Sequence, residues 1–144
     1  MADSISWECQ MMKNEILTIL DDLIIQGQTF VGNDLVFIPD FEKSLTEAFK
    51  RKVYTANELA YCELFDDSII RYASTWAAKE AVYKALKQFD AAAISWKKIE
   101  ITREKIAGKP TVSIHGQQTN YSIQLSISHD GNYAWAIALL IPIK

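Results

Sequence analysis

A glutamate and a lysine four residues apart are the first side chains in this sequence that could do chemistry together. On an α-helix, Glu80 and Lys84 would project from the same face. On a solvated helix they would be an ordinary ion pair worth about 0.3–0.5 kcal/mol. The neighbours at 77, 78, 81, 82, 85 and 86 are small or apolar, so we expect a largely buried helix. Buried charges need a ligand, a metal or each other, because unpaired burial is costly.

Asp34 is the second candidate for chemistry. It follows Gly32 and stands between apolar residues that favour strands, in Val31-Gly32-Asn33-Asp34-Leu35-Val36. An acid that caps or closes a turn would explain this segment equally well. A functional role needs a second acid, and Glu80 is the best candidate. Two carboxylates and several waters are the usual protein contribution to a Mg²⁺ site, to which the substrate adds phosphate oxygens.

A histidine at the end of a β-rich segment is the third candidate. His129 lies in Ser126-Ile127-Ser128-His129-Asp130, at the entrance to a tight turn. It could donate to phosphate or contact a nucleotide, or it could be a turn histidine with solvent partners only. His115 has no reactive neighbours in sequence, so we assign it a structural role. The sequence contains no Walker-type phosphate loop, no GxGxxG after a strand and no Gly-x-Ser-x-Gly elbow.

Composition narrows the possible classes of protein. The chain has 144 residues, enough for one domain, and its net charge of −3 argues against a nucleic-acid binder. Cys9 and Cys62, with the two histidines, lack the regular spacing of zinc ligands, so we interpret them as reduced thiols of a cytosolic protein. No signal peptide is visible, and the longest apolar run, Ala134 to Ile143, is too short to span a bilayer. We expect a cytoplasmic protein that binds neither nucleic acid nor membrane.

The elements that would position these residues are helices first and strands afterwards. The patterns predict helices over Ser4–Ile25 (closed by Gly27), Phe41–Lys50, Thr55–Leu64 (begun by a capping box at Thr55 and Glu58) and Ser68–Gln88. A strand over Phe30–Ile38 is expected to be interrupted at Gly32-Asn33-Asp34 and ended by Pro39. The β-rich segments are Ile94–Thr102, Pro110–His115, Tyr121–Ser128 and Asn132–Ile141, with Asp130-Gly131 as a hairpin signal. This order predicts an α+β domain with an antiparallel meander.

Two of the predicted helices carry surfaces that must pack on something. In the Ser68–Gln88 helix an alanine recurs every four positions. These alanines form a smooth ridge: Ala73, Ala77, Ala81 and Ala85. The first helix carries an apolar stripe formed by Ile5, Cys9, Met12, Ile16, Ile19, Leu20 and Leu23. The sequence does not say what that stripe covers.

Together these segments resemble the holo-acyl-carrier-protein synthase group of 4′-phosphopantetheinyl transferases. That family has an Asp after a glycine on its first strand, as in Val31–Val36, and a helix reading roughly W/F-A-A-K-E-A-x-x-K-A, which Trp76–Ala85 matches almost completely. Further similar segments follow in the family's order: Lys52–Leu59, Ile94–Ile101, Gly108-Lys109-Pro110 and Leu125–Asp130. The resemblance runs from about Phe30 to the C-terminus. It divides the chain into an N-terminal helical extension, residues 1–28, and a transferase domain, residues 29–144.

The resemblance implies a fold, a reaction and a set of roles. The fold would be a long alanine-rich helix packed on a small antiparallel sheet. Asp34 and Glu80 would coordinate Mg²⁺ and act in catalysis with Lys84, which would contact the phosphates of coenzyme A. The nucleotide end would be bound by His129, Lys109 and Pro110. The enzyme would transfer phosphopantetheine to a serine on the acidic helix of an apo acyl carrier protein and release 3′,5′-ADP. Either Glu80 or a metal-bound water would accept the serine proton.

The family also implies an assembly. Its small members are typically homotrimers with active sites between subunits, in which Asp34 and His129 could face Glu80 of a neighbouring chain. The N-terminal helix could cover an apolar surface, extend the trimer interface or favour another assembly.

Four positions depart from the family pattern. Phe30 replaces a glycine, Phe37 a glutamate, Asp40 a basic residue that helps dock the carrier, and Thr75 an arginine. A replacement basic surface could come from Lys43, Lys50, Arg51 and Lys52. These departures motivate one alternative, a non-catalytic family member that binds coenzyme A or a carrier. Composition and periodicity alone would also fit a generic α+β interaction domain.

Overall fold

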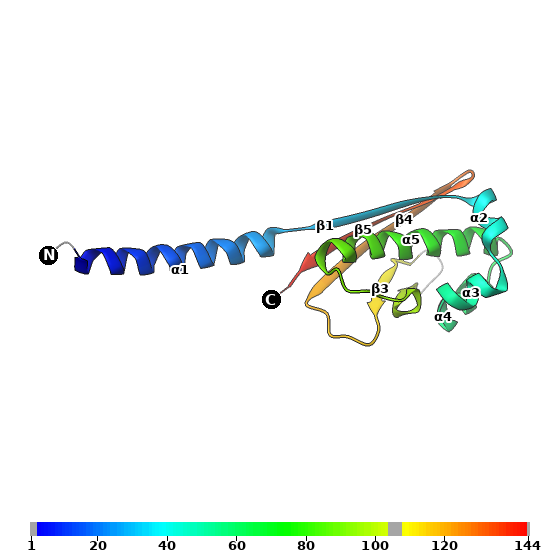
Figure 1. Ribbon diagram of the computed structural model, residues 1–144. Coiled ribbons are helices and arrows are strands. Elements are labelled where there is room, and N and C mark those ends of the chain that lie inside the picture. The colour runs from blue at the N-terminus through cyan, green and yellow to red at the C-terminus, as the bar shows by residue number, and fades with distance from the viewer. Residues whose placement is uncertain (1–2, 104–107, 144) are drawn as a thin grey trace.

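A long helix packed on a three-stranded antiparallel sheet forms the body of the molecule (Figure 1). The computed structural model describes residues 3–103 and 108–143. The sheet has the order β1–β5–β4, with β1 at Phe30–Phe37, β4 at Tyr121–Asp130 and β5 at Tyr133–Pro142. Helix α5, Ser68–Phe89, packs on one face of it. This arrangement confirms the predicted α+β fold.

Smaller elements surround the body at one end and one side. Helices α2, α3 and α4 span Ile38–Ser44, Glu47–Val53 and Ala56–Cys62. A second sheet pairs β2, Ile99–Thr102, with β3, Thr111–Ile114, and a short 3₁₀ helix η1, Trp96–Lys98, precedes it. The prediction that the four C-terminal segments form one meander is therefore wrong. β2 pairs with β3 and β4 pairs with β5, as in a meander, but β3 and β4 belong to different sheets, and β1 adds to the free edge of β5.

The predicted interruption of the first strand is also wrong. β1 pairs with β5 without a break, from Phe30 opposite Leu140 to Phe37 opposite Tyr133. Backbone pairing with β5 overrides the weak strand propensity of glycine, asparagine and aspartate. Pro39 lies in the first turn of α2, where its missing N–H costs no hydrogen bond.

Two other predicted boundaries shift for local reasons. The single helix expected over Phe41–Lys50 is two helices, because Thr46 starts α3 by accepting a hydrogen bond from the Phe49 N–H at 3.1 Å. The hairpin between β4 and β5 is confirmed one residue later than predicted. Asp130 still pairs with Tyr133, so Gly131 and Asn132 form the turn. Gly131 has a φ of +54°, which glycine adopts without strain.

Gly32 allows β1 to lie directly on α5. A Cβ at this position would lie 1.8 Å from the Ala81 carbonyl oxygen and 2.7 Å from the Ala85 nitrogen. The alanines at 73, 77, 81 and 85 are all fully buried, which confirms the predicted ridge. This close approach fixes the residues that follow Gly32 on β1 against the middle of α5.

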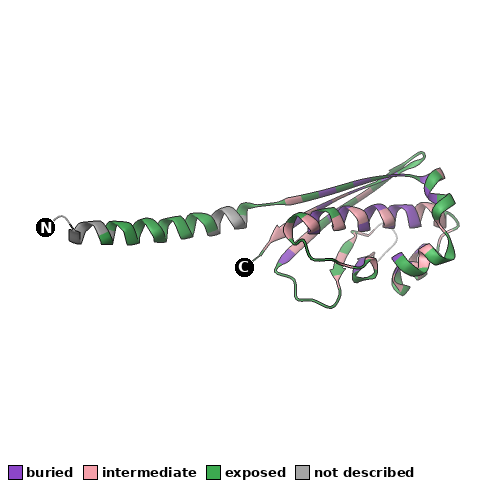
Figure 2. Cartoon of the chain, viewed as in Figure 1, coloured by how far each residue is buried: buried purple, intermediate pink, exposed green. Residues whose placement is uncertain are grey.

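Helix α1, Asp3–Gly27, extends away from the body along the direction of β1 (Figure 1). Its described side chains are exposed, as Figure 2 shows in green. Seven large apolar residues among them are 47–61% exposed: Trp7, Met11, Met12, Ile16, Leu17, Ile19 and Leu20. The described part of α1 thus covers no apolar surface of its own chain. Residues 1 and 2 of the predicted N-terminal extension lie outside the described residues. No helix in the described part of the chain could cross a membrane.

Candidate active site

Lys84 on α5 joins the helix to β1. Its Nζ donates to Asp34 Oδ1 at 2.8 Å and to the Asn33 carbonyl oxygen at 3.0 Å. The Asp34 side chain is 10% exposed and that of Lys84 51%, so one side of the pair is buried and the other open to solvent. Lys84 is therefore paired across two elements rather than within its own helix.

Glu80, one turn earlier on α5, meets the same aspartate. Burial raises the pKa of its carboxyl to about 7, helped by a hydrogen bond with Asp34 and by the negative charge of Asp34, and opposed by Lys84. The two carboxyls can therefore share a proton near neutral pH, or exchange it for a cation. Within the described residues no cluster of three or more acids, histidines or cysteines is arranged so that it could hold a metal ion. A metal held by Asp34 and Glu80 would thus take its remaining ligands from water and substrate, as Mg²⁺ commonly does.

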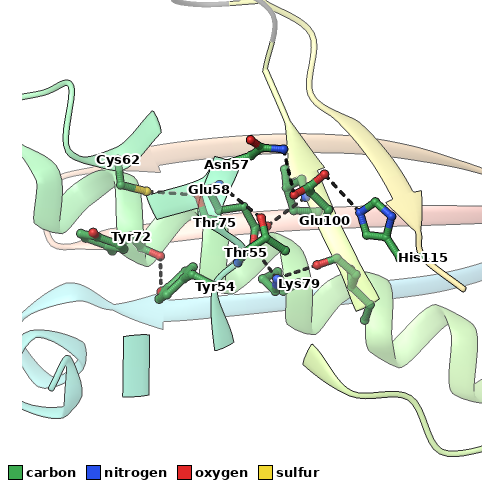
Figure 3. Close-up of polar contacts among 12 residues, drawn as sticks. Tyr54, Thr55, Asn57, Glu58, Cys62, Tyr72, Thr75, Lys79, Glu100 and His115 are labelled. Carbon is green, nitrogen blue, oxygen red and sulfur yellow. Dashed lines mark hydrogen bonds and ion pairs between the residues drawn. The ribbon is translucent and has the colours of Figure 1, made fainter. Parts of the chain in front are cut away.

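The lysine that precedes Glu80 has a different role (Figure 3). Lys79 is fully buried, and its Nζ donates to Glu58 Oε1 at 2.6 Å and to the Ile99 carbonyl oxygen at 2.5 Å. Glu58 also accepts from the backbone N–H of Thr55 and of Ile101, both at 2.9 Å. The predicted capping box is confirmed, and its glutamate additionally ties α4, α5 and β2 together.

His115 lies in this structural network rather than at the open cluster. Its Nε2 is 3.2 Å from Glu100 Oε1, which belongs to β2. Asn57 of α4 donates to the other oxygen of Glu100 at 3.4 Å. The structural role predicted for His115 is thus consistent with its contacts (Figure 3).

The residues predicted to bind the nucleotide line a separate cavity of about 490 Å³. It brings together His129, Lys109 and Pro110 from two distant segments of the chain, and adds Arg71 and Arg103. The described residues that line it are Tyr61, Arg71, Ser74, Arg103, Gly108, Lys109, Pro110, Leu125, Ser126, Ile127 and His129. Among these described residues are three arginine or lysine side chains and no acid, so this lining suits an anion.

Arg103 is a cavity residue that the sequence did not reveal. Its Nη1 donates to Thr75 Oγ1 at 3.1 Å, and its guanidinium lies 4.8 Å from the centre of the Tyr61 ring. Burial lowers its pKa, as expected for a cation held largely away from water. Ser74 Oγ, also in the lining, is buried and has no hydrogen-bond partner among the described residues. Both groups could therefore serve a ligand in this cavity.

The family model described as the 4′-phosphopantetheinyl transferase superfamily matches residues 30–138. The chain belongs to this family. The holo-[acyl-carrier-protein] synthase of Chlorobaculum parvum is 38% identical over 117 residues, covering 78% of this chain and 98% of that protein. Similar synthases from several other bacteria are 31–37% identical, which makes this chain an enzyme of the holo-acyl-carrier-protein synthase type.

Solved structures of the family share the fold. The ACPS–CoA complex of Chronobacterium ammoniagenes superposes with a TM-score of 0.73 at 27% identity, covering 81% of this chain and 99% of that one. Helicobacter pylori holo-[acyl-carrier-protein] synthase in complex with coenzyme A gives a TM-score of 0.64 at 27% identity, covering 76% and 98%. The family match begins at residue 30, so α1 lies outside it.

The two clusters of predicted site residues lie on opposite edges of the sheet. Asp34 is on edge strand β1 and His129 on edge strand β4, with β5 between them. Asp34 meets Glu80 of its own chain, whereas the resemblance implied that it could face Glu80 of a neighbouring chain. His129 lies away from this pair, on the cavity.

The positions that depart from the family have specific surroundings. Phe30 packs edge-on against Phe89, and Phe37 packs against Tyr133 on the outer face of the sheet. Asp40 is exposed and pairs with Lys43 at 3.5 Å. Lys50 contacts Glu47 and Glu63, at 3.5 and 3.7 Å. Of the four residues of the predicted basic surface, Lys43 and Lys50 are thus paired with acids of this chain, and Arg51 and Lys52 are exposed on α3.

Proposed function

We propose that this enzyme transfers the 4′-phosphopantetheine group of coenzyme A to a serine of an apo acyl carrier protein and releases 3′,5′-ADP. The observation that carries this proposal is the cluster in which Lys84 lies 2.8 Å from Asp34 while Glu80, with a pKa of about 7, hydrogen-bonds to the same aspartate. It offers one cation and two carboxyls on an open surface. The relatives solved with coenzyme A support the choice of donor.

The reaction determines what these side chains must do. The serine oxygen attacks the β-phosphorus of the pyrophosphate, the bond from that phosphorus to the bridging oxygen breaks, and 3′,5′-ADP leaves with the electron pair. Lys84 offsets negative charge on the phosphates. A Mg²⁺ ion held by Asp34 and Glu80 would neutralise further charge on the pyrophosphate. The serine proton would pass to Glu80 or to a water bound to that ion.

The basic cavity is proposed as the site of the nucleotide end. Lys109, Arg71 and Arg103 line it together with His129, so a phosphorylated nucleotide would find cationic donors there. Thr75 replaces the arginine expected from the family, and Arg103 reaches the same place from a different element by donating to Thr75 Oγ1. We therefore infer that Arg103 takes the place of the arginine that the family has at position 75.

We infer that the complete site lies between two chains. The Asp34 cluster and the basic cavity lie at opposite edges of one sheet, and a contact between the β1 edge of one chain and the β4 edge of another would join them. Such a head-to-tail contact is heterologous, and it forms a closed ring when the rotation that relates successive chains closes. The outer sheet face also exposes Leu35, Tyr133 and Trp135, at 60%, 48% and 46%. These features support the homotrimer predicted from the sequence. A cytoplasmic location stays a prediction.

Incubation with coenzyme A, Mg²⁺ and a set of apo carriers tests the proposal. Mass spectrometry of each carrier should show the gain of one phosphopantetheine on at least one of them. The second candidate, a family member that binds without catalysis, is favoured by Phe37 and Asp40 at the positions linked to carrier docking. Coenzyme A binding with no mass gain on any carrier would support that candidate instead.

A further inference from the structure

Helix α1 carries large apolar side chains of the kind that pack against another element, yet it contacts little of its own chain. It is 25 residues long and projects from the body (Figure 1). Met12, Ile16 and Ile19 are 61%, 52% and 58% exposed. An isolated helix is marginally stable in water, and large exposed apolar patches are typical of interaction sites. Helix α1 therefore needs a partner.

The apolar residues of α1 follow a heptad pattern. Steps of four and three residues alternate along one line of the helix, through Ile5, Cys9, Met12, Ile16, Ile19 and Leu23. This is the a/d spacing with which helices wind around one another in a coiled coil. An α-helix of 3.6 residues per turn keeps such a line on one face when it supercoils slightly to the left. The stripe thus matches the surface of another helix with the same repeat.

We propose that α1 forms a parallel coiled coil with the α1 helices of other copies of this chain. The positions beside the stripe determine the orientation. One flank carries Glu8, Glu15 and Asp22, one heptad apart, and the other flank carries Lys13. In a parallel, in-register pair, Glu8 of one helix faces Lys13 of the next. In an antiparallel pair the acidic flanks would face each other and repel.

Charge argues against two other classes of partner. Helix α1 contains five acidic residues and one basic residue, Lys13. The acidic residues are Asp3, Glu8, Glu15, Asp21 and Asp22. This excess repels an anionic lipid surface and the acidic helix of a carrier protein. In an assembly with rotational symmetry, α1 leads into β1 with the same geometry in every copy, so the α1 helices can run parallel to one another. The inference uses no residue of the proposed active site.

Cross-linking of Cys9 in the full-length chain tests the parallel register. Cys9 lies on the stripe and is exposed, whereas Cys62 is buried. With copper phenanthroline, two Cys9 thiols should lose two protons and two electrons to the oxidant and form a disulfide-linked dimer, because in-register helices bring them together. The control variant Cys9→Ser/Asn14→Cys places the thiol away from the stripe and should cross-link at least tenfold more slowly. Equal rates, or no Cys9 disulfide, would overturn the proposal.

Sedimentation of matched double variants tests the stripe itself. Ile16→Glu/Ile19→Glu should raise the concentration at which the full-length oligomer dissociates by at least tenfold. Asn14→Glu/Thr18→Glu adds the same charge off the stripe and should change it less than threefold. Equal behaviour of the two variants would contradict the proposal. Neither readout measures phosphopantetheine transfer, so a failure here would leave the proposed function to its own test.

Discussion

Lys79 and Glu80 are adjacent in the motif of α5, yet they face different surroundings. Successive helical residues point about 100° apart, so Lys79 enters the core to meet Glu58 while Glu80 meets Asp34 at the surface of the body. The sequence led us to Asp34, Glu80 and Lys84 because charged residues stood in apolar surroundings. It did not reveal Lys79 as a core residue, because its partners Glu58 and Ile99 are about 20 residues away.

The pKa of Glu80 makes a prediction for stability. The carboxyl titrates at 4.5 ordinarily and at about 7 in the folded chain. Between these values the folded protein holds a proton that the unfolded chain has lost, so this group makes stability fall as pH rises from 4.5 to about 7. Removing it with Glu80→Gln should therefore stabilise the protein relative to wild type above pH 7, and by progressively less towards pH 4.5. Urea unfolding without divalent ions measures the difference, and a difference independent of pH would contradict the assignment.

Arg103 was missed because its sequence neighbours carry no motif and its task depends on contact with Thr75. Arg103→Ala should raise the KM for coenzyme A about 10–100-fold, the loss expected for charged hydrogen bonds to a phosphate, with a smaller effect on kcat. Arg103→Ala/Thr75→Arg should recover part of this loss, because the arginine returns to the same place from α5. Steady-state kinetics with the exposed control Lys98→Ala provide the comparison. A normal KM for Arg103→Ala would refute the role.

At the scale of elements, the strongest local sequence patterns predicted the helices correctly. The alanine ridge of α5 and the capping box of α4 both act within one helix, so their residues alone determine them. The boundaries of β1 and the separation of β2 and β3 from the main sheet depend on which strands meet. That choice rests on pairing between distant segments, such as Gly32 with Ala138, and local patterns cannot determine it.

Gly32 tests the contact between β1 and α5. In Gly32→Ala the new methyl would collide with the Ala81 carbonyl oxygen, which is backbone and cannot yield easily. We expect a loss of about 1–3 kcal/mol in the free energy of unfolding. Transfer should also fall by more than tenfold, because Asp34 lies two residues further along the displaced strand.

Gly27→Ala is the matched control, because an added Cβ there has nothing within 4 Å. It should leave both the free energy of unfolding and transfer near wild-type values. Normal stability and transfer for Gly32→Ala would show that the close approach does not position the site.

At the scale of the whole molecule, the arrangement of the two clusters predicts complementation between subunits. Glu80→Gln disables the carboxylate cluster, and Arg103→Ala/His129→Ala disables the cavity. If each site takes one cluster from each of two chains, an equal mixture allowed to exchange subunits should regain roughly a quarter of wild-type activity, by random assembly in a closed ring. Mixing Glu80→Gln with Asp34→Ala should regain nothing, because both residues belong to one cluster. Activity no greater than the sum of the separate variants would place the whole site in one chain.

The central claim is that Asp34, Glu80 and Lys84 form the centre at which phosphopantetheine is transferred. Loading of an apo carrier, followed by mass spectrometry, tests it most directly when wild type, Asp34→Ala, Glu80→Gln and the exposed control Glu42→Gln are compared at equal concentration. We predict full loading by wild type and Glu42→Gln, and at least a hundredfold slower loading by the other two, with unchanged circular dichroism. Loading by Asp34→Ala or Glu80→Gln at the wild-type rate would contradict the claim.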